Sequence, residues 1–484
     1  MPKPRADLRL LLLTDPRGYL EPCGCSQRPL GGLDKLAAVV TEAKKDGVPT
    51  LVLAAGDLTV GTELRPEDAD GARKQEELRA QTFVEAWKQI GVSAAAPGPL
   101  DLALPPAQRD DLLARSGFPW LVDNVGAPYA SARVLEVNGV KVGVLGLVGE
   151  DVGAIAQAKA QELRAQGAQL VVALVSGDRR TARVVAGKGP DVVLMGGLDL
   201  EKPLPPAVVG DALMVHAGYQ GQAVVKVELA LKAGEWEDAS SWSAQQAQAE
   251  LDRQIAELRA RIMEWSADSK VAKADLDAQR ARLQELVNQR AHPPSPRYAG
   301  RWFDATLVEL APEVRGDPAI AAKLDAHDRR VNDANRELLK DVLPKPAPKD
   351  AAHYVGSESC ASCHQQAFAW WRDTKHGRAY ATLERAHKEY NLSCVSCHVT
   401  GYNQPGGSTV THVENLKNVG CENCHGPGSQ HNEQPELAGL IAKSPTEATC
   451  LGCHTHEHSD RFAYEAFRKM LIVPGHGAPA DRQW

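Results

Sequence analysis

The sequence lacks three features that would narrow its class at once: a membrane-length hydrophobic run, a recognisable export signal and a strong excess of one charge. Its formal net charge is −7 over 484 residues and is spread along the chain, so nothing indicates a nucleic-acid partner. The apolar run Leu8–Leu13 is too short for a spanning helix, and no later run reaches that length. A chain of this size is expected to form about two to four domains.

Cysteine is scarce except in one stretch, where Cys-x-x-Cys-His occurs four times: at Cys360–His364, Cys394–His398, Cys421–His425 and Cys450–His454. Two thiols at this spacing can add across the two vinyl groups of one haem, and the next histidine can ligate its iron. Zinc also binds Cys-x-x-Cys pairs but does not require a histidine directly after each pair. The motifs therefore predict four haem c groups, with thioethers at Cys360, Cys363, Cys394, Cys397, Cys421, Cys424, Cys450 and Cys453 and proximal iron ligands at His364, His398, His425 and His454.

Covalent haem attachment also predicts a compartment. It normally takes place on the outer side of the cytoplasmic membrane, where thiol oxidation is controlled. We therefore expect a periplasmic or other extracytoplasmic protein whose export signal has been removed upstream of Met1. A lipid anchor at that trimmed start is one alternative, and no transmembrane segment is expected.

Residues 7 to about 232 alternate short apolar runs with helical patterns, which is typical of a layered α/β domain. Asn138-Gly139 has the composition of a hairpin turn. Strands are expected at 8–14, 50–56, 141–148, 170–176, 191–196, 212–218 and 223–231. Helices are expected at 31–46, 73–91, 151–167 and 179–187.

This half resembles the metallophosphoesterase superfamily, in particular its 5′-nucleotidase-like branch, through LLLTDPRGYLEPCGC, LVLAAGDLTVG, DVVLMGG and MVHAGYQGQAVVKVEL in that order. The resemblance implies an α/β sandwich domain over 1–235. The Asp and His motifs of the family's two-metal site correspond here to Asp15-Pro16-Arg17, Gly56-Asp57, Pro99-Leu100-Asp101, Ser176 and Gly197-Leu198-Asp199. Asp15 and Asp57 alone cannot clamp two cations. We therefore interpret them as a vestigial metal site and expect no phosphoesterase activity.

Cys23-Gly24-Cys25 lies among turn-forming residues of this half. A Cys-x-Cys loop is too short for an easy disulfide, although such bonds exist. Three interpretations stay open: a strained redox-active disulfide, a pair of metal ligands, and a structural turn.

The middle of the chain, 240–342, is expected to be a helical hairpin and connector. Leu251, Ile255, Leu258, Ile262 and Trp265 recur at coiled-coil spacing, and a second apolar stripe follows the break at 266–269. A short turn between helices favours an antiparallel hairpin. It could pack within the chain or make a homo-oligomer. A strand-bearing segment is expected at 298–312 and a third helix at 317–341, opened by Asp317-Pro318.

The proline-rich segment 343–350 predicts an extended linker and a domain boundary. Beyond it, 351–484 has too few aliphatic residues for an ordinary core. We therefore expect a mostly α-helical and irregular tetrahaem domain in which porphyrins supply buried apolar surface. A second histidine on an iron gives an electron carrier, whereas an open position permits substrate chemistry. The candidates for this role are His353, His376, His387, His412, His431, His456, His458 and His476.

The segment resembles the tetrahaem cytochrome family that accepts electrons from hydroxylamine oxidoreductase, through SCASCHQQAFAWWRDTKHGRA, SCVSCHVTGYNQPGG, NVGCENCHGPGSQH and FAYEAFRKMLIVPGH. The resemblance implies three haems with two histidine ligands and a five-coordinate haem at the second motif. It implies that His431 caps the haem of His364, His376 that of His425, and His476 that of His454. His412 has no counterpart in the family and could close the site of His398.

The sequence as a whole indicates a periplasmic multihaem c-type cytochrome that relays electrons between redox partner proteins. The alternative is an oxidoreductase that acts on a small nitrogen or sulfur species at the His398 haem or at Cys23 and Cys25. A metal-dependent phosphoesterase is the third and weakest interpretation.

Overall fold

The computed structural model describes residues 3–22, 28–61, 69–198, 200, 202–293, 295–455 and 458–471, which form two compact units. The first unit comprises 1–19, 30–61 and 87–316, and the second comprises 20–29, 62–86 and 317–484. The C-terminal part of the second unit thus begins at Asp317, before the proline-rich stretch 343–350 at which the sequence predicts a boundary. The second unit also includes two segments from the N-terminal half of the chain, 20–29 and 62–86.

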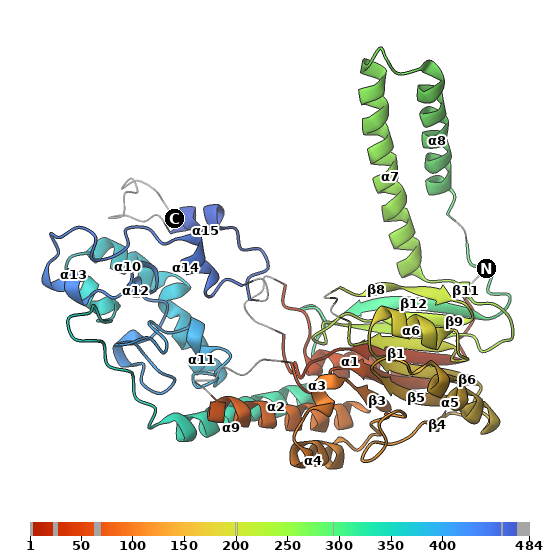
Figure 1. The fold of residues 1–484 in the computed structure, drawn as a ribbon, viewed down its shortest axis with the longest axis horizontal. Helices are drawn as coiled ribbons and strands as arrows, with labels where there is room; N and C mark the ends of the chain where they lie inside the picture. Colours follow the sequence, from red (N-terminus) through yellow and green to blue (C-terminus); the bar gives the residue numbers. More distant parts are fainter. Residues whose placement is uncertain are drawn as a thin grey trace. The chain divides into compact units, whose positions relative to one another are not determined.

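The first unit contains two mixed β-sheets (Figure 1). The first sheet has the order β11-β12-β10-β1-β2-β3 and the second the order β4-β5-β6-β7-β9-β8. The first consists of β1 (Leu8–Thr14), β2 (Thr50–Gly56), β3 (Ala94–Pro97), β10 (Ala223–Leu229), β11 (Glu237–Asp238) and β12 (Trp302–Glu309). The second consists of β4 (Arg133–Val137), β5 (Val140–Val148), β6 (Leu170–Ser176), β7 (Val192–Gly196), β8 (Leu204–Val209) and β9 (Ala212–His216).

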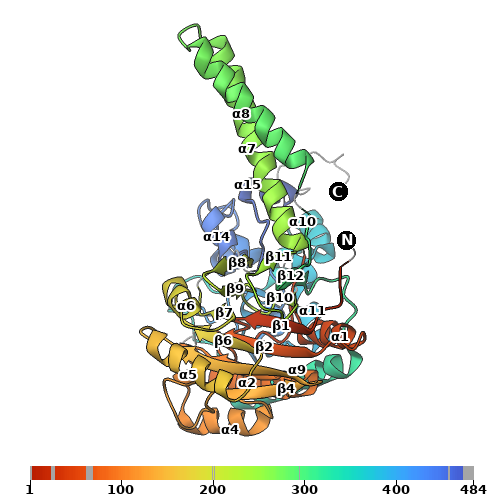
Figure 2. The same cartoon turned by 90° about the vertical axis from the view of Figure 1, so that its right-hand side faces the viewer.

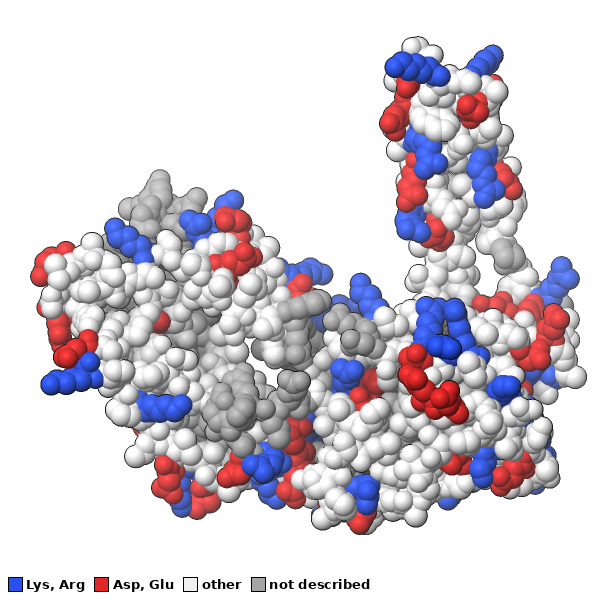
Figure 3. Space-filling model, viewed as in Figure 1, with Lys and Arg blue, Asp and Glu red and all other residues white. Residues whose placement is uncertain are grey.

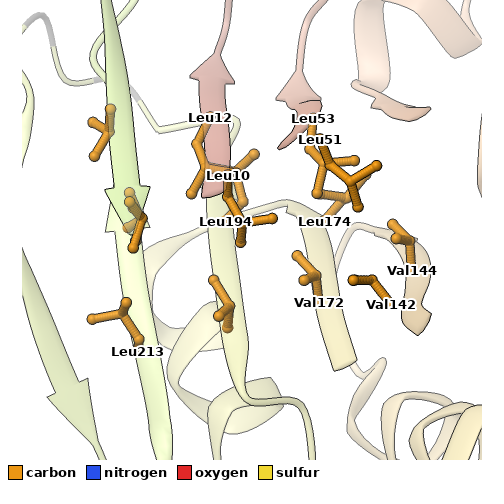
Figure 4. Close-up of a cluster of buried hydrophobic side chains, with 14 of the residues drawn as sticks. Leu10, Leu12, Leu51, Leu53, Val142, Val144, Val172, Leu174, Leu194 and Leu213 are labelled. Carbon is orange, nitrogen blue, oxygen red and sulfur yellow. The ribbon is translucent and has the colours of Figure 1, made fainter. Parts of the chain in front are cut away.

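The main core of this unit lies between the two sheets (Figure 4). Leu10, Leu12, Leu51 and Leu53 of β1 and β2 pack with apolar side chains of β5, β6, β7 and β9. Every residue of β1, β2 and β6 is buried, which matches the continuous apolar runs typical of strands covered on both faces. A second cluster packs the other face of the second sheet against α5 (Gly153–Ala165) and α6 (Arg179–Ala186).

The α/β prediction for this unit is confirmed, and all seven expected strands occur within two residues of their expected limits. At Asn138-Gly139, where Val137 pairs with Val140, both turn residues have positive φ, as a two-residue hairpin requires. Two differences concern the edges of the sheets. The strand of the expected connector is β12, which pairs with β10, so the sheet continues beyond residue 235. The short β3 and the outer β8 were not expected.

The remaining helices of this unit are α1 (Leu33–Lys44), α3 (Pro99–Leu102), α4 (Pro106–Ser116), α7 (Ser241–Ala267) and α8 (Lys273–Ala291). Helices α7 and α8 run antiparallel and project from the first sheet (Figures 1 and 2). Ile255, Leu258 and Leu286 are buried between them. Figure 3 shows cationic and anionic side chains interspersed along both helices. Arg253 and Glu250 of α7 form one ion pair, with an N–O distance of 2.5 Å.

The second unit is helical and irregular. Its longer helices are α2 (Ala69–Ile90, which belongs to this unit through Ala86) and α9 (Pro318–Leu339). The carboxylate of Asp317 caps α9 by accepting hydrogen bonds from the amides of Ala319 and Ile320. The short elements are η2 (Ser357–Cys360), α10 (Gln365–Asp373), η3 (His376–Arg378), α11 (Ala379–Ala386), η4 (Val395–Cys397), η5 (Glu414–Leu416), α12 (Cys421–His425), α13 (Ser429–Glu433), α14 (Glu447–Leu451) and α15 (Tyr464–Met470).

Candidate functional site

The two aspartates that the sequence predicts to be a vestigial metal site, Asp15 and Asp57, lie at the carboxyl ends of β1 and β2, and both are buried. The carboxylate of Asp15 accepts hydrogen bonds from the amides of Gly197, at 2.9 Å, and Asp57, at 3.0 Å. Asp57 in turn accepts from the amide of Leu100 at 3.0 Å. Gly56 makes room for this arrangement, because a Cβ there would lie 2.2 Å from Asp15 Oδ1.

Asp101 and Ser176, at two other positions compared with the family's motifs, also accept hydrogen bonds from backbone amides. Asp101 is fully buried and accepts from the amides of Leu58 at 2.6 Å and Thr59 at 2.8 Å, and from the Thr59 hydroxyl at 2.6 Å. The Ser176 hydroxyl accepts from the amide of Gly56 at 2.8 Å. Within the described ranges, no three His, Cys, Asp or Glu side chains are grouped to hold a metal ion. The carboxylates here bind the protein's own amides, and Asp199 lies outside the described residues.

The electrostatics of this centre are those of carboxyl groups removed from water. Burial raises the pKa of Asp15 to about 7 and that of Asp101 to about 6, in spite of the backbone amides that favour the charged forms. Burial also raises the pKa of Asp57. The Arg17 guanidinium, at the position where the family motif has histidine, lowers the pKa of both Asp15 and Asp57 and so opposes the effect of burial.

A pH dependence of stability follows from Asp15. The folded chain retains this proton up to about pH 7, whereas an exposed carboxyl releases it near 3.8. The folded state therefore binds more protons between these values, and the free energy of unfolding falls as pH rises through this window, by a few kcal/mol at most. We expect Asp15→Asn to reduce the difference between urea midpoints at pH 5 and pH 8, followed by far-ultraviolet circular dichroism. The exposed Asp211→Asn is the control, and an unchanged difference in Asp15→Asn would contradict the assignment.

Cys23 and Cys25 lie outside the described residues, but the chain just before them is described. The carboxylate of Glu21 pairs with Lys388, whose ammonium lies 3.2 Å from Asp328 of α9. Burial raises the pKa of Asp328 to about 7, which the Lys388 charge opposes. Lys388 precedes Cys394 by six residues, so this ion cluster links the segment at Glu21 to the segment just before the second motif.

All four Cys-x-x-Cys-His motifs lie in the second unit, on short helical turns. The first runs from η2 into the start of α10, the second spans η4, the third is α12, and the fourth covers the end of α14. The side chains of Cys360 and Cys421 lie close enough to interact, as do those of Cys453 and Cys397, and helix α12 packs against η2 and α14. The first motif is therefore adjacent to the third, and the second to the fourth.

Two pairs of imidazoles have the separation that a shared iron requires. The ring centroids of His364 and His431 are 6.3 Å apart, and those of His376 and His454 are 6.2 Å apart. A metal–nitrogen bond of about 2.0 Å plus a ring radius of about 1.1 Å puts each centroid about 3.1 Å from a metal, hence about 6.2 Å between two opposed rings. The spacing in both pairs fits an iron between the rings.

The second pair joins His376 to His454, whereas the resemblance implies that His376 caps the haem of His425. The backbone of His376 lies beside the third motif, since its carbonyl accepts from the amide of Val419 at 3.2 Å. His376 is thus close to residues of both motifs, and its role at the haem of His425 stays a prediction.

The proximal histidines meet a second requirement of iron ligands. Nδ1 of His398 lies 2.7 Å from the carbonyl of Ala379, and Nδ1 of His425 lies 2.6 Å from that of Ala442. A carbonyl only accepts, so Nδ1 carries the proton and Nε2 keeps its lone pair for a metal. Nδ1 of His454 lies 3.0 Å from the Ser459 hydroxyl. The donor set therefore fits haem iron.

The other candidate ligands are placed differently. His412 Nδ1 lies 3.1 Å from the Thr411 hydroxyl and 3.3 Å from that of Thr409. In the described part of the chain, no imidazole ring contacts that of His398. His456 and His476 lie outside the described residues. A cavity of about 290 Å³ adjoins the second motif and is lined by Cys397, Tyr354, Tyr402, Glu422 and Gly452, among others.

The surroundings of the second motif include helices that precede the predicted linker. Ala72 of α2 and Leu339 of α9 share an apolar cluster with Val395, Val399 and other residues near this motif.

A buried polar network joins the same parts. Gln75 Oε1 accepts from Asn335 Nδ2 at 2.9 Å and from the Leu392 amide at 3.0 Å, and Gln75 Nε2 donates to Asn391 at 3.1 Å. The sequence reasoning missed this network, because polar residues on two distant helices carry no signal that they meet.

Comparison with known proteins bears on both units. The family model described as cytochrome c554 and c-prime matches residues 359–426. Cytochrome c-554 of Nitrosomonas europaea is 38% identical over 93 residues, which cover 16% of this chain and 40% of that protein. The match thus spans well under two thirds of the relative's length. It supports a c-type cytochrome segment with haem c that takes part in electron transfer.

Several solved structures are similar to this chain at low sequence identity. A 5′-nucleotidase precursor from Thermus thermophilus has a TM-score of 0.44 at 16% identity, over 73% of this chain and 62% of that one. A calcineurin-like phosphoesterase from Bacillus subtilis has a TM-score of 0.45 at 14% identity, over 68% and 98%. No helix in the described ranges is both long and apolar enough to cross a membrane. The sequence match to the cytochrome family thus lies within the second unit, at residues 359–426.

Proposed function

We propose that this chain is a periplasmic tetrahaem c-type cytochrome that relays single electrons between redox partner proteins through its second unit. The observation that carries the proposal is the gathering of four attachment motifs in one unit, with two pairs of imidazoles at the spacing of a shared iron. Bound haem would supply an iron that changes valence by one electron.

In this proposal the protein holds each iron with little rearrangement. His364 and His431 would hold one iron, and His376 and His454 would hold another. The Nδ1 hydrogen bonds of His398, His425 and His454 keep the proximal rings in one orientation. A ligand set that does not move between valence states favours fast outer-sphere transfer.

The contacts between motifs support an order for the relay. The first motif is adjacent to the third through Cys360 and Cys421, and the fourth to the second through Cys453 and Cys397. The third and fourth are linked by the proximity of Cys424 and Cys450. We therefore propose the sequence first, third, fourth and second motif, with the outer members exchanging electrons with partners.

The remaining parts of the proposal rest on the sequence. A periplasmic location follows from covalent haem attachment, and a lipid anchor remains an alternative. No nucleic-acid partner is proposed. The charged hairpin of α7 and α8 is offered as a surface for self-association.

A second candidate function is an oxidoreductase acting on a small nitrogen or sulfur species at the His398 haem. The observation that favours it is the cavity of about 290 Å³ beside Cys397. Phosphoesterase activity is not proposed, because Asp15 and Asp57 alone cannot clamp two cations.

Counting electrons and accessible irons tests the function. Reductive titration of the exported protein is expected to consume four electrons per chain, and carbon monoxide is expected to bind at most two reduced irons, those of His398 and His425, to which no second imidazole is assigned. Both are measured by haem absorption. His376→Ala is expected to add one carbon monoxide-binding iron, whereas His292→Ala, at the exposed end of α8, is expected to add none. Fewer than four electrons, or carbon monoxide at more than two irons of the natural chain, would refute the electron-carrier proposal.

A further inference from the structure

Glu422, the second residue of the third motif, is a buried carboxylate that the haem chemistry above does not use. Its side chain is only 4% exposed. Oε1 accepts hydrogen bonds from the amides of Gly428, at 2.7 Å, and Val355, at 2.9 Å, and Oε2 accepts from the amide of Gly356 at 2.8 Å. A buried carboxylate with three backbone donors is strongly held, because each of these hydrogen bonds is charge-assisted.

These three donors belong to two segments that lead to opposite ligands of one iron. Val355 and Gly356 immediately precede η2, which carries Cys360 and leads to His364. Gly428 is the N-cap of α13, which carries His431. Glu422 itself lies in α12, between them in space. The Glu422 side chain therefore links the segment that leads to His364, the proximal ligand, with the segment that leads to His431, the distal ligand.

Neighbouring contacts reinforce the same junction. The Ser429 hydroxyl accepts from the amide of His353 at 2.9 Å, and the Ser357 hydroxyl accepts from the amide of Cys421 at 3.1 Å. Gly428 also approaches closely, since a Cβ there would lie 3.2 Å from Glu422 Oε1. His431 lies three residues beyond Gly428, so a shift of this segment, 428–431, moves the imidazole of His431 directly.

We propose that Glu422 is a positioning residue that holds His431 opposite His364 at the first haem. The inference rests on the haem-carrying function proposed above. Without the carboxylate, the segment from Gly428 to His431 is no longer linked to the backbone at Val355 and Gly356. The distal imidazole then leaves the iron in part of the molecules. The first haem then acquires an open position, while the other three keep their ligands.

The test uses Glu422→Gln, which keeps the shape of the side chain. An amide nitrogen would face at least one backbone N–H, so at least one hydrogen bond is lost and two donors oppose each other. We expect up to one more carbon monoxide-binding iron per reduced chain than in the natural sequence, and a matching rise in high-spin ferric iron by paramagnetic resonance. Glu433→Gln changes an exposed residue of α13, the helix that carries His431, and is expected to leave both counts unchanged.

A double variant identifies the haem concerned. His431→Ala is expected to expose one iron, and Glu422→Gln combined with His431→Ala is expected to expose no further iron. Carbon monoxide binding equal to the natural chain in Glu422→Gln would overturn the proposal, as would additive gains in the double variant. The haem content of each variant is measured alongside, so that a chain without four haems speaks against the proposed function rather than against the role of Glu422.

If Glu422→Gln does not accumulate with four haems, Ser429→Ala tests the same junction by removing a single neutral hydrogen bond. A smaller rise in carbon monoxide binding is then expected. A count equal to that of the natural chain in Ser429→Ala would overturn the proposal.

Discussion

Protein made without covalent haem, with serine at all eight motif cysteines, is expected to lose the folded structure of its second unit and to keep that of its first. The reason is the composition of the two cores. The first unit buries whole strands such as β1, β2 and β6 between its layers, whereas the apolar cluster described around the second motif consists of eight buried residues. So small a core does not offset the entropy of ordering the motif-bearing segments without the porphyrins and their thioether links.

Hydrogen exchange followed by mass spectrometry separates the two outcomes. Amides of α10 to α15 are expected to exchange at the rate of an unfolded chain in the haem-free protein, while those of β1, β2, β5 and β6 stay protected. The haem-loaded natural chain is the reference. Protection of α10 to α15 in the haem-free protein would contradict the prediction and would show that the polypeptide alone specifies the second unit.

Lys388→Met is expected to destabilise the haem-loaded second unit by about 3 kcal/mol. The ammonium of Lys388 pairs with both Glu21 and Asp328, and removing it leaves two carboxylates side by side, one of them buried. The loss is measured as the shift in the urea midpoint of haem absorption. It is expected to be smaller at pH 5 than at pH 8, because the pKa of Asp328 is already raised to about 7 by burial and protonation removes its uncompensated charge.

Two further variants test the cause of this loss. Lys340→Met removes an exposed pair with Glu337 at the end of α9, and we expect it to cost less than about 1 kcal/mol. Lys388→Met combined with Asp328→Asn is expected to recover much of the stability. A loss of similar size in Lys340→Met, or no recovery in the double variant, would indicate that Lys388 acts through packing of its aliphatic stem.

Sequence patterns were sufficient to predict those features that depend on residues close together in the chain. The mainly apolar runs at 8–14 and 170–176 favoured strands covered on both faces, and Asn138-Gly139 favoured a tight turn between neighbouring strands. Cys-x-x-Cys-His carries its chemistry within five residues, so attachment sites can be predicted without any fold. The replaced ligand positions near Asp15 and Asp57 were equally visible from sequence.

Long-range partners had no such signal. Gln75 contacts Asn335 and Asn391 across more than 250 residues, so nothing in its own surroundings indicates that α2 supports the second motif. Strand β12 looked like part of a connector because it is separated from β10 by two long helices, yet it pairs with β10 over its whole length. His376 and His454 likewise lie far apart in the sequence, and nothing in their own surroundings indicates that their rings come within 6.2 Å of each other.

The sequence by itself determined which atoms can bind haem, since covalent attachment depends on residues adjacent in the chain. It also determined the layered α/β order of the first half, because strand formation follows from runs of buried side chains. Only the tertiary structure decided which imidazoles face each other, which carboxylate joins their supporting segments and which helices belong with the motifs. Those choices depend on contacts between distant residues, whose free energy exists only once the chain has folded.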